Sequence, residues 1–558
     1  MIINTIIFIL YFNLFVLSTL GFGVLTIKFF NLNRSSTSFG LIGLIGFFAL
    51  TFISYITHIF LPHNYLHNFV VHGLGFFFLI LFFAKDKKFF LPNFIKVLAL
   101  TILFLLALFI AKNHEDFPYY HLPYTMQIVE NKIQFGIGFF NIAYRTPSSL
   151  FYLQSTFFLP HINIYLFHSS GLIILIFANL FLLDNFFFSS KKEKSNFIKI
   201  LSCLCFVFIN IAFARLGAYG TDRGGQIIAF VIFIVAFNYL NLKNINKLND
   251  LKILFILITY IISFKSYFIV YLLIPLLFFF EEKNTKQIFK DLKIIITLSF
   301  FVVLFLFINF SNSGCLLYPL KYSCFDNFSW SVTQKIAEHF SSWYELWSKA
   351  GATPDYRVQN PAEYVKNFNW VSNWVKNYFM GKGLQANSII LAIVIYFLIF
   401  LRSKNIVKKN YKFYSLYSLL ILFFLIWFNK HPDLRYGGFV LYTLIFFIPI
   451  SIYLSRFVIN KNNLNKFFLL TVIGTVIIFN SINILRITKS FNSERELYSF
   501  KNFPFFNIRQ PSYEIILLND LSKAYLVKED MCWATPTPCL SSRLQRKTIN
   551  SYQFFYNK

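Results

Sequence analysis

Apolar runs separated by short basic segments recur along the whole 558-residue chain. A run of about 18 or more apolar residues is long enough to cross a bilayer as a helix. The pattern therefore predicts an all-α polytopic membrane protein. The first run lacks a basic start and a small-residue cleavage site, so we expect it to remain as the first span. The predicted spanning helices lie near residues 4–27, 38–60, 67–84, 91–111, 166–188, 197–215, 224–241, 293–310, 387–402, 413–428, 437–455 and 467–486.

The stretch 252–280 is also apolar, but the letters SFKSY interrupt it. It fits two short helices or a re-entrant pair. If Lys265 lay within a span, its charge would be costly and would indicate function. If two short helices form, Lys265 lies in an outer turn instead. Counting two helices here gives a total of about 14 spans.

Basic segments such as KDKK, SSKKEK and RSKNIVKKNYK alternate with segments poor in lysine and arginine. Cytoplasmic loops carry an excess of these two residues, so the basic segments are assigned to the cytoplasm. This orientation predicts a membrane domain over 1–486 and a small outer tail over 487–558. It places two large loops, 112–165 and 311–386, on the outer, periplasmic side of a bacterial inner membrane. The short segments GAYGTDRGG and NKHPDLRYGG lie on the same side.

The composition also indicates a membrane protein, and it limits the kinds of partner that we expect the protein to bind. Hydrophobic residues make up 57% of the chain, more than a soluble domain of this size could bury, because its surface must be covered as well. The net charge of +28 follows from lysine-rich cytoplasmic loops and does not point to nucleic acid. Membrane lipids are the expected surroundings, and no nucleic-acid partner is expected.

The six cysteines give an independent indication of orientation. Cys203 and Cys205 lie within a predicted helix and are expected to be buried apolar thiols. The other four form two close pairs in predicted outer segments, where disulfides persist. Neither pair has CxxC spacing or a nearby histidine, so we do not expect a zinc site. The expected disulfides join Cys315 to Cys324 and Cys532 to Cys539.

The segment NHEDFPYYHLPY, residues 113–124, directly follows an apolar run and sets Glu115 and Asp116 side by side. Helix orientation and anchoring use Trp, Tyr, Lys and Arg, so neither purpose needs carboxylates there. One alternative is a solvated helix end. The concentration of polar and aromatic groups favours a site, with Glu115 and Asp116 as catalytic candidates. The expected substrate-loop residues are His114, Tyr119, Tyr120 and His121.

The semi-apolar segment that follows, from QIVENK to STFFLP, is moderately amphipathic. Such a segment between two spans suits a helix that lies in the membrane interface. Its isolated cation, Arg145, has two interpretations. Its guanidinium either extends to the water layer without a specific role or binds an anionic lipid headgroup, for which its fork is suited.

An acidic pair at the start of the first large outer loop, followed by interfacial helices, resembles the GT-C class of glycosyltransferases. The chain departs from that pattern, because the pair follows the fourth predicted helix and not the first. The chain also resembles a group of uncharacterised bacterial multi-pass membrane proteins. They share the acidic loop, a loop like GCLLYPLKYSCF and a CW…P.PC tail.

The resemblance to the GT-C class implies a sugar transfer on the outer face of the membrane. The donor would be a polyprenyl-phosphate-linked sugar, and the acceptor a glycan, lipid or protein. Such a transfer needs a base that takes the acceptor's proton, and Asp116 matches the position of that base. A divalent cation, Mg²⁺ or Mn²⁺, is an open question, because one acidic pair does not settle it.

Two further outer segments carry candidate residues. TDRGGQ contains Asp222, the second acidic candidate, although its glycines also fit a plain polar turn. NKHPDLRYGG contains Asp433 and Arg435, which could simply pair with each other or form part of a phosphate site. With Arg145, the candidate ligands of a lipid phosphate are Arg223, Lys430, His431 and Arg435.

Two other classes of protein fit parts of the pattern. A polysaccharide polymerase or ligase of the O-antigen type also uses a large outer loop with basic groups. A lipid or solute transporter would show broken helices and polar residues near the membrane midplane, whereas here the polar residues gather at one face. Five tryptophans in 311–386 could stack on sugars, but their spacing of four at 343/347 and 370/374 equally predicts helix packing.

Overall fold

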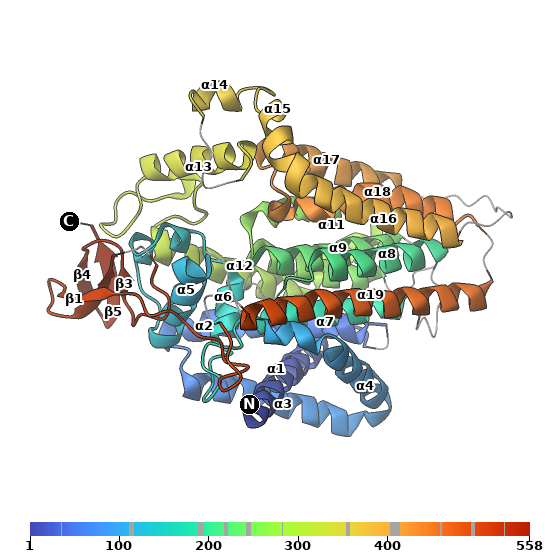
Figure 1. The fold of residues 1–558 in the computed structure, drawn as a ribbon, viewed down its shortest axis with the longest axis horizontal. Coiled ribbons are helices and arrows are strands. Elements are labelled where there is room, and N and C mark those ends of the chain that lie inside the picture. The colour runs from blue at the N-terminus through green and yellow to red at the C-terminus, as the bar shows by residue number, and fades with distance from the viewer. Residues whose placement is uncertain are drawn as a thin grey trace.

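The structure is a computed structural model that describes most of the chain. The described residues are 1–34, 36–110, 116–187, 195–216, 221–240, 247–281, 283–352, 358–401, 413–457, 460–492, 497–528 and 531–557. His114 and Glu115 lie outside them. Helices form nearly all of the molecule, and five short strands lie at one end of it beside the C-terminus (Figure 1).

The N-terminal half contains four long helices, a set of short ones, and then further long helices. The first group is α1 (Ile2–Phe29), α2 (Phe39–Phe60), α3 (Tyr65–Lys85) and α4 (Lys87–Leu103). The short set is η1 (Leu105–Phe109), η2 (Phe117–His121), α5 (Leu122–Glu130), η3 (Ile137–Phe139), η4 (Ile142–Arg145) and α6 (Ser149–Ser155). The next group is α7 (Ser169–Phe186), α8 (Asn196–Ala212), α9 (Thr221–Leu240) and α10 (Lys247–Ile262).

The C-terminal half repeats this alternation and ends in strands. It continues with η5 (Ser266–Leu272), α11 (Leu273–Glu281), η6 (Lys283–Lys290), α12 (Leu292–Ser313), η7 (Lys321–Ser323), α13 (Gln334–Lys349), α14 (Pro361–Val365), α15 (Val371–Trp374) and η8 (Val375–Gly383). It ends with α16 (Leu384–Leu401), α17 (Tyr414–Lys430), η9 (Leu434–Gly438), α18 (Phe439–Leu454), α19 (Lys461–Phe491), β1 (Tyr513–Leu517), β2 (Lys523–Val527), β3 (Cys539–Leu540), β4 (Gln545–Ile549) and β5 (Tyr552–Tyr556).

Nine helical stretches among the described residues are long and apolar enough to cross a membrane. They are Ile2–Phe29, Phe39–Phe60, Tyr65–Lys85, Ser169–Phe186, Thr221–Leu240, Leu292–Ser313, Val371–Leu401, Leu434–Leu454 and Lys461–Phe491. Three shorter apolar helices accompany them: Asn196–Ala212, Ser266–Phe280 and Tyr414–Lys430. The helical architecture predicted from the sequence is therefore present. Nine long stretches do not establish the expected count of about 14, because several remaining helices are short.

Polar contacts join the helix ends beside the basic segments. The backbone N–H of Asn33, after α1, donates to the side chain of Asn249 in α10 at 2.8 Å. At the start of α2, the Ser38 hydroxyl donates to Asp184 of α7 at 2.6 Å. Lys252 of α10 forms an ion pair with Asp291 at the start of α12. The short helices α5 and α6, helix α13 and the strands lie toward the opposite end (Figure 1), so segments predicted to be outer gather together there.

The interrupted stretch 252–280 folds as two helical segments joined by a turn. This is one of the arrangements that the sequence allowed. The chain leaves α10 at Ile262, turns, and returns through η5 and α11. The turn contains Lys265, whose extended backbone (φ −150°, ψ 125°) caps the start of η5. Lys265 therefore lies at the end of the helices where the outer loops gather, and not in the middle of a span.

The segment after the acidic loop, in which interfacial helices were expected, folds as several short helices. The segment breaks into α5, η3, η4 and α6, and every residue of α6 is buried. Gly136 adopts φ 79°, a conformation that ends regular helix and favours glycine. The polar side chains of the segment find partners inside the protein, as Gln154 does with the Ser170 hydroxyl at 3.2 Å. Burial and internal hydrogen bonding therefore make much of the segment part of the core.

Histidines tie the α2–α3 connection to this buried segment. The Nδ1 atom of His63 lies 2.6 Å from the Ser155 hydroxyl of α6, and its Nε2 atom lies 3.2 Å from the Ser54 carbonyl. The rings of His67 and His58 face His63, with centroids 4.4 and 5.4 Å away. Burial lowers the pKa of His63 well below 6.5, and the two neighbouring imidazoles lower it further.

We expect His63→Gln to reduce the acid sensitivity of folding. A histidine with a depressed pKa in the folded state contributes stability above its unfolded pKa, 6.5, and this contribution is lost as pH falls below that value. Glutamine keeps polar atoms for Ser155 and Ser54 but does not titrate. Thermal unfolding at about pH 7.5 and about pH 5 should show a smaller difference for the variant. Replacement of the exposed His339 by glutamine should leave the difference unchanged, and an equal change in both variants would contradict the assignment.

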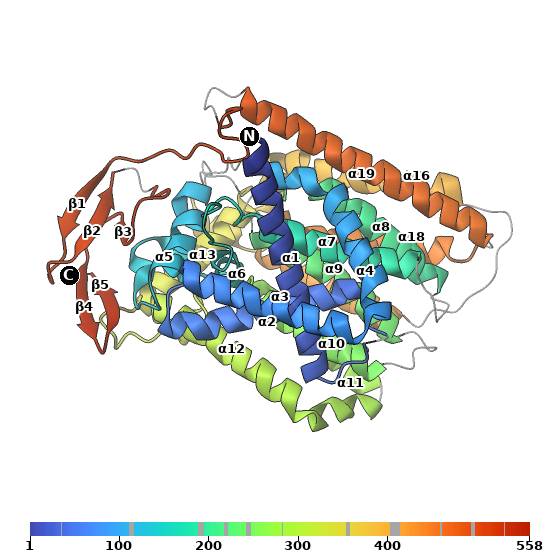
Figure 2. The ribbon, with the colours of Figure 1, turned by 90° about the horizontal axis from the view of Figure 1, so that it is seen from below.

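The tail that was predicted to be outer is a small β structure docked on the first of the two large predicted outer loops. Strands β1, β2 and β3 form one sheet and β4 pairs with β5. The backbone N–H of Phe135 donates to the Gln553 carbonyl at 2.8 Å, and Phe555 N–H donates back to Phe135 at 2.8 Å. Trp533 N–H donates to the Pro118 carbonyl at 3.0 Å, two residues after Asp116. Figure 2 shows the segment after α19 passing the N-terminus of α1 on its way to these strands.

Both expected cysteine pairs form disulfides. Cys315 joins Cys324 in the second outer loop, and Cys532 joins Cys539 beside β3. The Cys203 side chain is a buried free thiol in α8, as is its neighbour Cys205. The tail therefore has a covalent link within it and backbone hydrogen bonds to the first loop.

Candidate functional site

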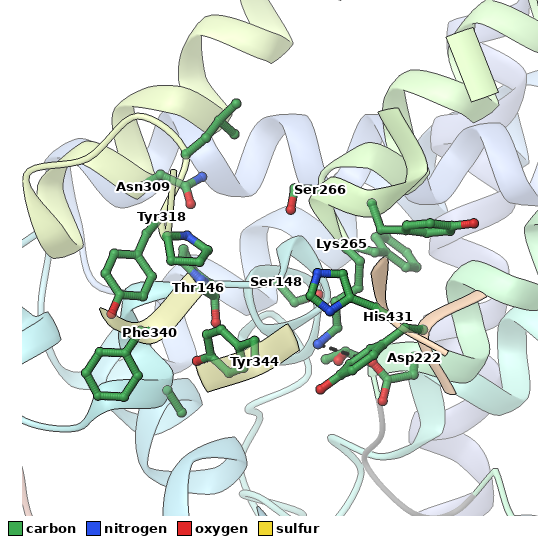
Figure 3. A pocket seen from close by; sticks show the side chains of 18 of the residues that line it. Thr146, Ser148, Asp222, Lys265, Ser266, Asn309, Tyr318, Phe340, Tyr344 and His431 are labelled. Atoms are coloured by element: carbon green, nitrogen blue, oxygen red, sulfur yellow. Dashed lines mark ion pairs between the residues drawn. The ribbon is translucent and has the colours of Figure 1, made fainter. Parts of the chain in front are cut away.

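A cavity of about 630 Å³ lies where the predicted outer segments meet. Five separate parts of the chain line it, and they are distant in sequence (Figure 3). Asp222, Lys265 and His431 lie together on one side of this cavity, while Tyr318 and Phe340 lie on the other (Figure 3). The polar and charged lining residues are Asp116, Tyr119, Tyr120, Thr146, Ser148, Thr221, Asp222, Ser263, Lys265, Ser266, Tyr267, Asn309, Tyr318, Ser341, Tyr344, His431, Arg435 and Tyr436.

Asp222 is held between two cations. Its Oδ1 atom lies 3.2 Å from the Nζ atom of Lys265, and its Oδ2 atom lies 3.3 Å from the Nε atom of Arg435. The Asp222 side chain is only 17% exposed, and the side chains of its two partners are about one-third exposed. Attraction between these charges is therefore less screened than at an open surface. The three groups together carry one excess positive charge.

Local structure fixes the positions of Asp222 and Arg435. Asp222 stands in the first turn of α9, where the helix dipole favours a carboxylate. Arg435 stands in η9, which is kinked at Tyr436 (φ −88°, ψ 47°) and at Gly437 (φ 89°). The Gln226 amide of α9 donates to the Arg435 carbonyl at 3.0 Å and ties the kink to the helix that carries Asp222.

Asp433 acts on the backbone and does not make the simple side-chain pair with Arg435 that was one interpretation of the sequence. Its Oδ1 atom accepts a hydrogen bond from the Arg435 backbone N–H at 3.0 Å and another from the Tyr378 hydroxyl at 2.7 Å. Burial raises the pKa of Asp433, although the nearby Arg435 charge opposes the shift. These hydrogen bonds to Asp433 therefore stabilise the backbone of η9. The Arg435 guanidinium lies beside Asp222 instead.

Asp116 and two tyrosines of η2 bring the first outer loop into the cavity. Asp116 precedes η2, and Tyr119 and Tyr120 lie within that helix. Burial raises the pKa of Tyr120 well above 10.0, and the charges of Asp116 and Asp222 raise it further. Its hydroxyl therefore stays protonated and can donate a hydrogen bond. His121 is buried outside the cavity lining, with its ring 5.5 Å from that of Phe151.

One aromatic face of α13 forms a wall of the cavity. Phe340, Trp343, Tyr344 and Trp347 follow the spacing of a single helix face. The Trp343 and Trp347 rings are stacked at 6.3 Å, and the guanidinium of Arg435 lies 5.6 Å from the Trp347 ring centre. The other tryptophan pair is a packing pair, because Trp370 is fully buried and lies outside the cavity lining. Trp343 and Trp347 therefore line the cavity, whereas Trp370 and Trp374 are buried outside its lining, although both pairs have the same spacing.

His431 lines the cavity at the end of α17. Its Nδ1 atom lies 3.4 Å from the Ser348 hydroxyl of α13. Burial lowers the pKa of His431, with an opposing contribution from Glu345. A lowered pKa makes the imidazole less charged at neutral pH. Lys430, its neighbour, has a side chain that is 62% exposed and lies 3.8 Å from Glu345, outside the cavity lining.

Two other predicted phosphate ligands also lie outside the cavity lining. Arg145 is buried, where it donates to the Gly138 carbonyl at 2.9 Å and to the Tyr318 hydroxyl at 3.4 Å. It therefore links η4 to the second outer loop and does not extend to the membrane surface. Arg223 donates to the carbonyl of Arg215.

Several lining residues were not selected from the sequence. Lys265 was noted, but an outer turn without a role was the favoured interpretation. Tyr344, Tyr436 and Asn309 were not singled out. The aromatic periodicity of 340–347 could have indicated the α13 wall, whereas a single asparagine at the end of α12 gives no comparable signal.

Within the described ranges, no three His, Cys, Asp or Glu side chains come together as ligands of a metal ion. In the cavity, both oxygens of Asp222 already face cations. These oxygens are therefore poorly suited to a further cation.

Comparison with known proteins identifies a family but no characterised relative. A family model described as a domain of unknown function, DUF8201, matches residues 5–442. Because this range covers most of the chain, the protein belongs to that family. The range includes every residue that lines the cavity and ends before α19 and the β tail. No curated protein and no solved structure matches the chain.

Proposed function

We propose that this member of the DUF8201 family is an integral-membrane glycosyltransferase. It transfers a sugar from a polyprenyl-phosphate donor to a glycan, lipid or protein acceptor of the cell envelope. The observation that carries the proposal is one cavity that combines Asp116, the Asp222–Lys265–Arg435 cluster and the aromatic face of α13. Such a cavity offers a base, cations for a phosphate and a surface on which a sugar ring can stack.

Asp116 is the proposed general base. The acceptor hydroxyl oxygen forms a bond to the anomeric carbon while the bond from that carbon to the phosphate oxygen breaks. The electron pair of the broken bond leaves with the lipid phosphate, and the hydroxyl proton passes to Asp116. Asp222 is less suited to this role, because Lys265 and Arg435 already hold both of its oxygens. We assign Asp222 as a positioning residue for these two cations.

Lys265 and Arg435 are the proposed partners of the leaving phosphate. Their cluster with Asp222 retains one positive charge, which favours a dianion over a neutral ligand. Arg435 brings a planar fork of N–H donors, the geometry that matches phosphate oxygens. Its guanidinium also lies beside the Trp347 ring, so the phosphate end and the sugar end of one donor can both be accommodated in this part of the cavity.

The proposed topology has 14 crossings. Adding α4 and α10 to the nine long and three shorter apolar stretches gives this number. Basic segments then face the cytoplasm, and the cavity faces the periplasm of a bacterial inner membrane. A donor bound there would keep its polyprenyl chain in the bilayer. The reaction as proposed uses no Mg²⁺ or Mn²⁺, since Lys265 and Arg435 supply positive charge at the phosphate.

The test compares cells that lack the protein with cells rescued by the wild type. Lipid-linked sugars and surface glycans are measured by mass spectrometry. The proposal expects a missing surface sugar and an accumulated polyprenyl-phosphate sugar, with both changes reversed by the wild-type gene. If the cells lose long repeat polymers but accumulate no single-sugar donor, the result would indicate a polymerase or ligase of the O-antigen type. Movement of a lipid or solute without sugar transfer in proteoliposomes would indicate a transporter. Either result would reject the transferase.

A further inference from the structure

Two aromatic rings of the tail pack against the residue that directly follows Asp116. That residue, Phe117, is buried. The rings of Trp533 and Phe506 both meet the Phe117 ring edge to face, with centroids 6.2 and 6.1 Å away. Aromatic pairs attract each other in this geometry. Residues far from Asp116 in the sequence therefore enclose its neighbour.

A backbone hydrogen bond joins the same two parts of the chain. In a helix, the Pro118 carbonyl would accept from the N–H of the residue four or five positions later. The Leu122 N–H donates to the Phe117 carbonyl instead, and Pro123 has no N–H. The Trp533 N–H supplies the missing donor, since it lies 3.0 Å from the Pro118 carbonyl oxygen. The prolines thus leave an acceptor that the tail satisfies.

The backbone of Trp533 is itself held in an uncommon conformation. Its φ of 49° lies in the left-handed region, which bulky residues rarely adopt. The disulfide from Cys532 to Cys539 begins at the preceding residue, and the Thr535 N–H donates to the Cys532 carbonyl at 2.9 Å. Such a conformation persists only where its surroundings fix it, and it is most common at functional sites. Residues 532–539, here called the tail turn, therefore hold the Trp533 ring in one direction.

The tail turn also contacts the far end of the helical segment that begins beside Asp116. This segment runs through η2 and α5 to Glu130. The Thr537 hydroxyl donates to the Glu130 carboxylate at 2.7 Å and accepts from the Asn131 amide at 2.8 Å. Strand β3, at the end of the turn, lies beside α5 in both Figure 1 and Figure 2. The tail turn therefore holds this helical segment at both of its ends.

We propose that the tail turn positions Asp116 in the cavity, with Trp533 as the main positioning residue. This inference rests on the proposed function, in which Asp116 is the base. A base must lie within hydrogen-bond reach of the acceptor hydroxyl, and a shift of about 1 Å is costly. The proposed phosphate partners, Lys265 and Arg435, stand on other elements, before η5 and in η9. Loss of the Trp533 ring should therefore change the rate constant of transfer and not the binding of the donor.

The first arm of the test needs no substrate and measures amide hydrogen exchange of the purified full chain in nanodiscs. Trp533→Gly removes the ring, keeps the N–H and permits the left-handed backbone. Amides of residues 119–124 should exchange about threefold to tenfold faster than in the wild type, as expected for a lost aromatic pair. Trp533→Phe should restore slow exchange. Phe500→Gly, which removes an exposed tail ring that packs on Phe491 of α19, should leave exchange unchanged.

Correct folding of each variant is checked by its disulfides and by unchanged exchange in α7. If Trp533→Gly does not fold, Thr537→Ala provides a milder change, because it removes one hydroxyl at the other end of the helical segment. The amides of residues 127–130 should then exchange about threefold faster. Unchanged exchange there, or at 119–124 in a folded Trp533→Gly, overturns the proposal.

The second arm measures transfer in proteoliposomes. The donor is the polyprenyl-phosphate sugar that accumulates in cells lacking the protein. Trp533→Gly should lower the rate constant by about tenfold to 10²-fold and leave the KM for the donor unchanged, and Trp533→Phe should recover most of the rate. Faster exchange at 119–124 with a full rate constant overturns the positioning of Asp116. If the wild type transfers no sugar, the proposed function fails, while the exchange arm still decides whether the tail turn holds this helical segment.

Discussion

Asp116→Asn is expected to abolish sugar transfer while leaving the fold intact. An amide has nearly the shape of a carboxylate but cannot accept the acceptor's proton. Loss of a general base typically lowers a rate by about 10²–10⁴-fold. Cells that carry the variant should therefore lack the surface sugar and accumulate the polyprenyl-phosphate donor. The rate constant for transfer in proteoliposomes should fall, while the affinity for the donor should change little.

Two controls make this experiment specific. Glu338→Gln alters an exposed acid on α13, outside the cavity lining, that pairs with Lys321, and it should retain full activity. Protease resistance and both disulfides should be the same in Asp116→Asn as in the wild type. Full rescue by Asp116→Asn would show that Asp116 is not the base. Attention would then move to Glu115, which lies outside the described residues.

Arg435→Gln is expected to impair both stability and transfer, and its cost in stability should be smaller when Asp222 has already been changed to asparagine. Removing one partner of a fully buried ion pair costs about 3–5 kcal/mol, because the other charge is left unpaired. Here we expect about 2 kcal/mol, since 35% of the Arg435 side chain is exposed and Lys265 still faces Asp222. In an Asp222→Asn background the Arg435 guanidinium has already lost its carboxylate partner, so the same change at Arg435 removes less.

The measurement is a double-mutant cycle from unfolding of the purified protein, together with transfer rates. Stability should be non-additive: the double variant should lose less stability than the sum of the losses of Arg435→Gln and Asp222→Asn. Transfer should stay low in the double variant, by about 10²-fold or more, because the phosphate has lost a donor. The surface pair Lys321 and Glu338 should show coupling below about 1 kcal/mol. Additive stability effects at Asp222 and Arg435 would contradict the proposed arrangement.

Much of the candidate site was visible in the sequence as separate pieces. Asp116, Asp222, His431 and Arg435 were selected because charged groups at the mouths of apolar helices are uncommon, and all four line one cavity. Other candidates lie outside the cavity lining because of their side-chain direction. Arg145 and Lys430 are equally near helix ends, but one is buried against Tyr318 and the other extends to solvent. Sequence spacing does not specify which side of a helix end faces a neighbouring segment.

The same limit explains why the surroundings of Lys265 and Arg223 could not be predicted from the sequence. The SFKSY interruption could be a break within a span or a turn between two helices, and local propensity is similar for both. Packing of η5 against α9 and η9 decides that Lys265 meets Asp222. Arg223 is adjacent to Asp222 in sequence, yet its guanidinium donates a hydrogen bond to the Arg215 carbonyl and does not line the cavity.

By itself the sequence determined the class of the protein. Long apolar runs require a nonpolar environment, basic segments set the two ends of the helices apart, and cysteines seven and nine residues apart are close enough to pair. These are local properties, because each depends on the composition of one segment. Only the tertiary structure decided which helix ends meet, that the loop after Asp116 becomes core, and that two cations distant in sequence, Lys265 and Arg435, share the Asp222 carboxylate. Those outcomes depend on contacts between segments far apart in the chain, and such contacts are fixed by packing.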